Sequence, residues 1–187
     1  MTLLTLHAVR LLGFADTHSV AVRFSQDPGV VESQLIDAGV NGFVSHSTFA
    51  GISGWSLSSL GRRENERLLA KELDGARARD AVQAVHDDFA DINTGVVEAC
   101  SAIQLQNPAA EGAMDVLIGA LASWRPLEAQ LIGALPRFEG YSERLLRALK
   151  HAVLDTSWLT ATDRDSFHKV WFELHEDLIA TLGIQRR

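Results

Sequence analysis

The stretch DPGVVESQLIDAGVNGFVSHSTFAGISGWSLSSLGR, residues 27–62, carries the signals that decide the fold. Asp27 followed by Pro28 predicts the start of a helix, because a carboxylate can accept from the first-turn amides and proline at the first helical position loses no hydrogen bond. The apolar positions that follow recur at helical spacing: Val31, Leu35 and Ala38. Asn41-Gly42 then predicts the end of this helix.

Two short runs rich in β-branched and aromatic residues follow, at 43–46 and 52–57. They predict two strands of a hairpin around Gly51. Because Ser53-Gly54 lies inside the second run, we expect strand pairing to begin only at Trp55. Ser58 is then placed to cap a long helix that ends near residue 73.

Upstream of this stretch the chain predicts two more helices. Apolar residues at helical spacing place the first at 3–12, with Gly13 as its stop, and Asp16 or Thr17 begins a short second helix that ends near Ser25. The whole chain is therefore expected to be mainly α. Three helices, a hairpin and a returning helix form a winged helix-turn-helix over residues 1–75, followed by an α-helical bundle over 76–187.

One group of positions in the first domain resembles the MarR-type transcriptional regulators. They read Val31-Glu32-x-x-Leu35, Gly42-Phe43-Val44 and Gly54-Trp55-Ser56-Leu57-Ser58-x-x-Gly61-Arg62. The resemblance implies a DNA-binding regulator that is homodimeric and responds to a small-molecule effector. In such a fold the third helix lies in the major groove of double-stranded DNA.

The charge of the chain opposes that implication. The 187 residues include 17 Lys+Arg against 24 Asp+Glu, a formal net charge of −7. A helical wheel of the third helix exposes no Lys or Arg, although cations must neutralise phosphates. The exposed positions are Gly29, Val30, Glu32, Ser33, Ile36 and Asp37.

Candidate DNA contacts remain in three places. Ser33 and Gln34 are polar residues of the third helix that could reach base edges or phosphates. The wing offers hydroxyl and imidazole groups, and the returning helix begins with a basic pair that could grip a phosphate: His46, Ser47, Thr48, Arg62 and Arg63. The alternative is a winged-helix module that binds a protein or senses a small molecule and does not bind DNA.

From residue 76 onward the pattern predicts five or six helices that serve dimerisation or ligand binding. The first is expected at 76–91 and the second after a Thr94 cap. The next runs from Asn107-Pro108 to Pro136, with a kink or break at Pro126. Another follows a Ser142 cap, and the last runs from about 163 to 182 behind Thr162-x-x-Asp165. Two segments of this domain, Pro136–Tyr141 and Asp165–Leu178, resemble a helical region found beside phosphoenolpyruvate-utilising enzymes. That resemblance implies an architecture and no reaction.

The last predicted helix carries His168, Trp171 and His175 on one face. Such a stripe is typical of core packing; the alternative is a small-molecule pocket lined by Trp158 and Trp171, with His168 or His175 as polar anchors. Seven helical residues separate the two histidines by about 10 Å, too far for one metal ion. We therefore expect no metal, no cofactor and, since no catalytic motif is present, no enzymatic activity.

The remaining expectations concern location. Cys100 is the only cysteine and lies in an apolar helical stretch, which favours an inert core thiol in a cytoplasmic protein. The longest apolar run is far below the roughly 20 residues of a membrane helix, so we expect no membrane partner.

Overall fold

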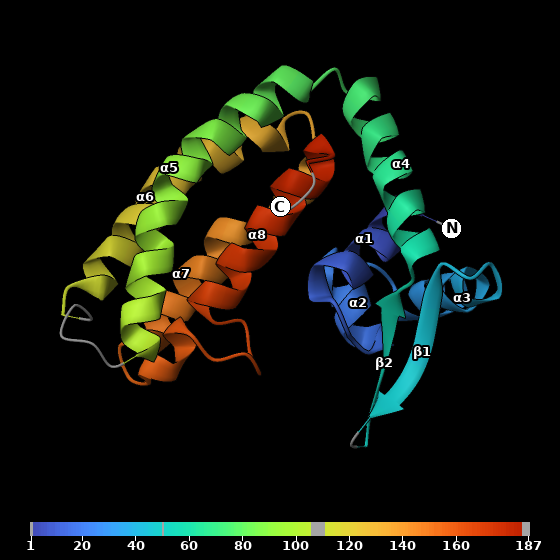
Figure 1. The fold of residues 1–187 in the computed structure, drawn as a ribbon, viewed down its shortest axis with the longest axis horizontal. Coiled ribbons are helices and arrows are strands. Elements are labelled where there is room, and N and C mark those ends of the chain that lie inside the picture. The colour runs from blue at the N-terminus through green and yellow to red at the C-terminus, as the bar shows by residue number, and fades with distance from the viewer. Residues whose placement is uncertain (1, 50, 106–110, 185–187) are drawn as a thin grey trace. The chain divides into compact units, whose positions relative to one another are not determined.

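The computed structural model describes residues 2–49, 51–105 and 111–184 and consists of two compact units (Figure 1). Unit 1 comprises Met1–Gly75 together with the residues from Gly183 onward, and unit 2 comprises Ala76–Leu182. Each unit has its own core, and each is described separately below.

Unit 1 consists of three helices, an antiparallel hairpin and a further helix. They are α1 (Leu3–Leu12), α2 (Thr17–Arg23), α3 (Pro28–Val40), β1 (Val44–Phe49), β2 (Ile52–Leu57) and α4 (Ser59–Gly75). The arrangement is winged-helix-like, as the sequence predicts. Its core joins α1, α2, α3 and the start of β1, and the fully buried residues include Leu6, Val9, Val20, Val31, Leu35 and Ala38.

The predicted caps of unit 1 are present. The carboxylate of Asp16 accepts a hydrogen bond from the Ser19 amide at 2.8 Å, and that of Asp27 accepts from the Val30 amide at 3.0 Å. The hydroxyl of Ser58 accepts from the Gly61 amide at 3.0 Å. Side-chain oxygens thus satisfy amides at the starts of α2, α3 and α4 that have no partner within the helix.

The hairpin pairs over its full length, from Val44↔Leu57 to Phe49↔Ile52. The expectation that pairing begins only at Trp55 was therefore wrong. Two contacts hold the outer part: the hydroxyls of Thr48 and Ser53 lie 2.7 Å apart across the strands, and the ring of Phe14 covers Gly54 so closely that a Cβ there would lie 2.8 Å from it.

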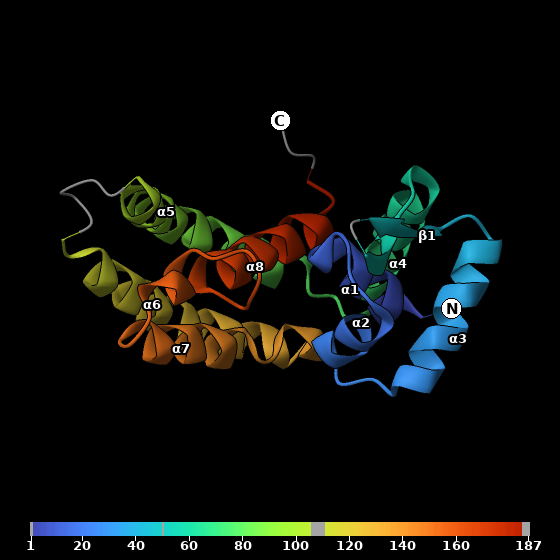
Figure 2. The ribbon, with the colours of Figure 1, turned by 90° about the horizontal axis from the view of Figure 1, so that it is seen from below.

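Unit 2 is built from four α-helices and two 3₁₀ turns. They are α5 (Arg79–Gln104), α6 (Ala113–Ile132), η2 (Pro136–Phe138), α7 (Tyr141–Ala152), η3 (Thr156–Leu159) and α8 (Phe167–Leu182). The helices pack in a ring, α5 on α6, α6 on α7, α7 on α8 and α8 back on α5 (Figures 1 and 2). No strand occurs between residues 76 and 184 where the chain is described.

In unit 2 the helix start predicted at Thr94 was wrong, and of the kink or break predicted at Pro126 the break was wrong. Thr94 caps nothing, because it is exposed and the buried positions of α5 continue in phase on either side of it, at Phe89 and Val96. Pro126 lies inside α6 without ending it. A proline deprives the carbonyl four residues earlier of its donor, but Ala122 is exposed, so water can take that role while the buried Trp124 and Leu127 hold the helix to the core.

Two predicted caps were also wrong. α7 begins at Tyr141 behind Gly140, whose φ is 98°, and the carboxylate of Glu128 in α6 accepts from the Ser142 amide at 3.1 and 3.2 Å. α8 begins at Phe167, where the Ser166 hydroxyl accepts from the Lys169 amide at 3.2 Å. The predicted start at Asn107-Pro108 lies outside the described residues. None of the helices within the described ranges is long and apolar enough to cross a membrane.

Gly61 is a position of unit 1 where a side chain would collide with the backbone. A Cβ there would lie 1.9 Å from the carbonyl oxygen of Phe43, so we expect Gly61→Ala to lower the free energy of unfolding by about 3 kcal/mol through overpacking against backbone. Urea unfolding followed by circular dichroism measures this. Gly119→Ala in α6 is the control, because nothing lies within 4 Å of its Cβ position. We expect it to be neutral or stabilising by about 0.5–1 kcal/mol, and equal losses in both variants would contradict the packing argument.

Candidate interaction surface

The outer face of α3 is the surface that a winged helix would offer to a partner. The inward residues Val31, Leu35 and Ala38 are fully buried, so the opposite side of the helix faces solvent. Three aliphatic side chains stand out on that side, with exposed fractions of 51% for Val30, 53% for Ile36 and 84% for Val40. The helical wheel predicts the first two; Val40, the last residue of the helix, was missed.

The charge of this face is wholly acidic. Glu32 and Asp37 are exposed, and neither makes an ion pair with any residue that the structure describes. α3 contains no Lys or Arg. A phosphate backbone approaching it would therefore meet carboxylates and aliphatic groups, both of which oppose its binding.

The two polar candidates on α3 are engaged within the fold. The hydroxyl of Ser33 donates to the Gly29 carbonyl at 3.1 Å. The side chain of Gln34 is half-buried and points to α1, where its oxygen accepts from the hydroxyls of Thr2, at 2.8 Å, and Thr5. Gln34 therefore fastens α3 to α1, and a base contact would require breaking these bonds.

The wing leaves its three candidate residues accessible. His46, Ser47 and Thr48 are all exposed on β1. The imidazole of His46 lies against the Trp55 ring, with 4.6 Å between ring centroids, and Thr48 is tied to Ser53. Ser47 is paired with Gly54 across the hairpin, on the face where the Phe14 ring covers that glycine.

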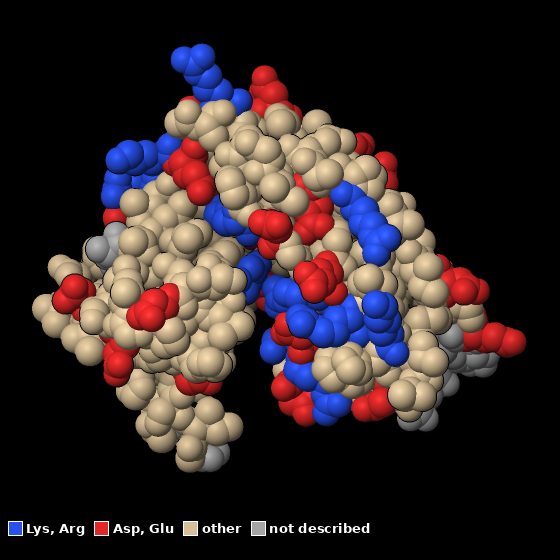
Figure 3. Space-filling model, turned by 180° about the vertical axis from the view of Figure 1, so that it is seen from behind, with Lys and Arg blue, Asp and Glu red and all other residues tan. Residues whose placement is uncertain are grey.

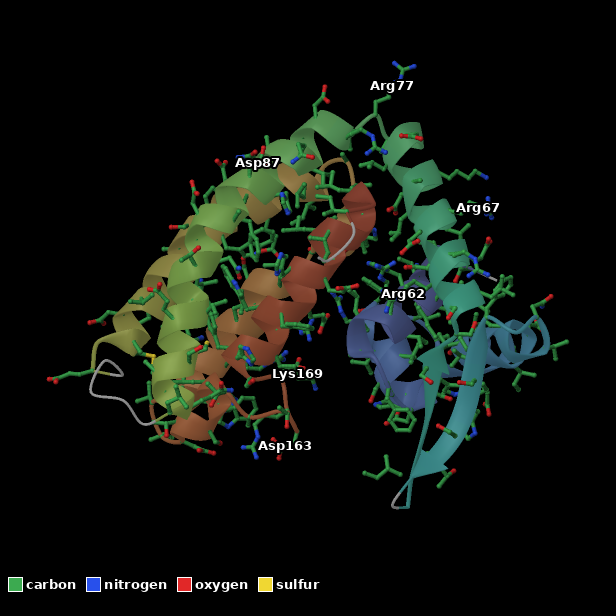
Figure 4. The ribbon with its side chains drawn as sticks, viewed as in Figure 1. Arg62, Arg67, Arg77, Asp87, Asp163 and Lys169 are labelled. Carbon is green, nitrogen blue, oxygen red and sulfur yellow. The ribbon has the colours of Figure 1, made fainter. Side chains whose placement is uncertain are left out.

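The two arginines predicted at the start of α4 do not form one phosphate-binding site. Arg62 and Arg63 are both exposed, but adjacent helical residues point about 100° apart. Arg63 shares its side of α4 with Arg67 and Lys71, whereas Arg62 lies on the other side of the helix, as Figure 4 shows for Arg62 and Arg67. Arg67 is bound to Glu64 at 2.7 and 2.8 Å.

The predicted aromatic pocket of unit 2 has its members in two different settings. Trp171 is 2% exposed, stacks on Phe89 with 4.9 Å between centroids, and donates its indole N–H to Asn93 at 3.0 Å. Trp158 stacks instead on His151 at 4.4 Å, with the Arg164 guanidinium 5.5 Å from its ring. Trp171 thus packs as a core residue, the alternative that the stripe pattern predicts.

The two histidines of the stripe are half-buried. The ring of His175 lies 5.4 Å from that of Phe89, beside Trp171. Burial lowers the pKa of His168 below its ordinary value, so at neutral pH it is an uncharged ring. No three His, Cys, Asp or Glu side chains in the described ranges lie close enough to hold a metal ion.

A buried polar network, which the sequence analysis did not identify, ties α7 and α8 to the turn before α7. Asp177, fully buried in α8, accepts hydrogen bonds from Arg137 and from the Tyr141 hydroxyl at 2.9 Å, and Arg137 also donates to Thr181 at 2.6 Å. These donors lie in the segment 136–141, and Asp177 in the segment 165–178. The residues behind the second resemblance therefore contact one another as parts of the structure.

A second network lies at the other end of the same interface. Arg144 binds both oxygens of Glu173 at 2.7 Å and Asp165 at 2.9 Å. Arg144, Lys169 and Arg147 hold the pKa of Asp165 below its usual range, although burial acts in the opposite direction. Asp165, which the sequence assigns to a helix cap, is instead a partner of Arg144.

The cations over α7 and α8 form no uniform positive patch. Glu143 lies on the same side of α7 as Arg147 and Lys150, and Asp155 and Asp163 are ion-paired with Arg164. On the face that Figure 3 shows, acidic side chains lie next to the basic ones.

An open hollow of about 390 Å³ between α5 and α6 is a further feature that the sequence did not predict. Its walls are mostly small residues, with Glu98 and Glu111 as the charged groups. Neither of these two glutamates belongs to the predicted aromatic pocket.

Neither a protein-family model, nor a curated protein, nor a solved structure matches this chain.

Cys100 allows a test of the core of unit 2. It is 2% exposed, and burial raises the pKa of its thiol to about 11. Because the thiolate is the reactive form, we expect no labelling by iodoacetamide at pH 8 in the native state and complete labelling in denaturant. Labelling of native protein at the rate of a free cysteine would contradict this packing.

Asp165 allows a test of the second network. Its folded-state pKa lies below the unfolded value of about 3.9, so its contribution to stability is present above that pH and is lost as the pH falls through the folded value. We expect Asp165→Asn to lower Tm at pH 7 and to flatten the fall of Tm below pH 4. Asp88→Asn, at an exposed position of α5, is the control. Parallel Tm–pH curves for wild type and Asp165→Asn would refute the role of this carboxylate.

Proposed function

We propose that unit 1 is a winged-helix docking module whose α3 binds a protein surface and not double-stranded DNA. The observation that carries the proposal is the outer face of α3. It exposes Val30, Ile36 and Val40 beside two unpaired carboxylates and contains no cation. A matching surface would be apolar at its centre, to cover the aliphatic groups, and basic at its rim, to meet Glu32 and Asp37.

The proposal gives unit 2 a structural role and assigns it no effector. Among the predicted anchors, Trp171 and His175 lie beside Phe89, whereas Trp158 stacks on His151. His168 belongs to neither of these ring contacts. The buried networks around Asp177 and Arg144 are satisfied by side chains of the unit itself.

The second candidate is a DNA-binding regulator of MarR-like type. Two observations favour it: the helix and wing that such regulators lay on DNA are both exposed, and Arg62 and Arg63 stand in solvent at the start of α4. In that case the phosphate contacts would come from α4 and the wing, because Ser33 and Gln34 are engaged within unit 1.

A fluorescence-anisotropy titration of mixed-sequence duplex DNA separates the two. At about 50 mM salt, where cation–phosphate contacts are strongest, the docking module is expected to show no saturable binding at micromolar protein. Saturable binding that weakens with salt, and that Arg62→Ala with Arg63→Ala reduces, would reject the docking proposal. Lys150→Ala with Arg147→Ala in unit 2 removes the same charge elsewhere and is the matched control.

A further inference from the structure

The unit that carries the acidic face of α3 also carries an exposed basic row on α4. Arg63, Arg67 and Lys71 recur every four residues and so lie along one side of the helix, with Leu60, 44% exposed, one turn before them. Neither Arg63 nor Lys71 makes an ion pair within the described ranges. The row thus combines positive charge with the methylene groups of its side chains. The outer face of α3 offers no positive charge.

We infer that the surface docked on α3 is α4 of a second copy of this chain. A two-fold axis then places α3 of the second copy on α4 of the first, so that each contact is made twice. This inference rests on the proposed function and names its partner. The occupant cannot be α3 of the second copy, because that pairing would set Glu32 and Asp37 against the same carboxylates with no cation between them.

The dimensions of the two faces are compatible. Glu32 and Asp37 are five residues apart, about 7.5 Å along the helix and about 140° around it, so they lie on opposite edges of the outer face. Arg63 and Lys71 are eight residues apart, about 12 Å along α4. The long, flexible Arg and Lys side chains can cover the difference. Their methylene stems can also lie on Val30, Ile36 and Val40 while the charged ends reach the carboxylates at the edge.

The outer face of α3 cannot bind a second copy of the chain and the major groove of DNA at the same time. A second copy seated on α3 covers the helix that a winged helix would insert into the major groove. The arrangement also differs from dimerisation through the helical unit, which the sequence analysis expects.

Reversing the charges on α3 and on α4 of the full chain tests the inference. Sedimentation velocity over a hundred-fold range of concentration in the micromolar range is expected to show a monomer–dimer equilibrium for wild type. Glu32→Arg with Asp37→Arg, and separately Arg63→Glu with Lys71→Glu, should each raise the dissociation constant at least tenfold. The four substitutions together should restore dimerisation, because the charges then oppose each other again.

Two controls keep the outcome interpretable. Circular dichroism checks that each variant is folded, and Val97→Ser, at a half-exposed position of α5, should leave dimerisation unchanged where Ile36→Ser weakens it. A wild-type chain that stays monomeric, a dimer that neither charge reversal weakens, or a fourfold variant that stays monomeric would each overturn the inference. None of these outcomes would contradict the proposal that α3 of unit 1 binds a protein surface. Only saturable DNA binding would contradict that proposal.

Discussion

The close approach of α4 to the carbonyl of Phe43 is the contact on which unit 1 depends. Gly61 permits it, since a Cβ would lie 1.9 Å from that oxygen. Ser58 completes it, donating its hydroxyl to the Gly42 carbonyl at 2.6 Å and accepting from the Gly61 amide. The end of α3, the start of β1 and the start of α4 therefore meet at one point. With its end fixed there and Gln34 fastened to α1, α3 can present only one face to solvent.

Local signals in the sequence were sufficient for most of unit 1. Asp16, Asp27 and Ser58 act on amides three residues away, so their roles as caps can be read from the adjacent sequence. The helical wheel of α3 correctly separates buried from exposed positions for the same reason, apart from the exposed Val40, which it omits. What it cannot give is the direction of a polar side chain at the boundary. Gln34 was a DNA-contact candidate, and only the hydroxyls of Thr2, just before α1, and Thr5, within it, turn its side chain inward.

The two wrong cap assignments in unit 2 share a physical cause. At Ser142 and Asp165 a side chain that could serve its own helix start is replaced or claimed by a partner distant in sequence, Glu128 in one case and Arg144 in the other. At Pro126 the local penalty is small because the affected side of α6 faces solvent, and burial of Trp124 outweighs it. Long-range contacts thus override local preference where the helices pack. No pattern within one segment reveals such contacts.

The buried networks also change the meaning of the second resemblance. Arg137, Tyr141 and Asp177 lie in the two segments that carry this resemblance. In the structure the buried carboxylate of Asp177 accepts hydrogen bonds from both Arg137 and Tyr141. Removing one partner of such a set leaves a buried charge uncompensated, at a cost of about 3–5 kcal/mol. A requirement of that size is enough to keep these residues together in any chain that folds this way, without a reaction.

The same reasoning separates fold from function in unit 1. The winged-helix-like arrangement depends on Gly61, the caps and the inward residues of α3, and none of these touches a partner. A chain can therefore keep the whole arrangement while the outer face of α3 changes freely. Here that face holds aliphatic side chains and two carboxylates that no cation among the described residues neutralises. Leaving such a face in water forgoes roughly 25 cal/mol for every Å² of apolar surface that a partner would cover, and a phosphate backbone cannot supply that gain. The proposal of a protein partner for α3 therefore rests on this surface and not on the winged-helix-like arrangement of the unit.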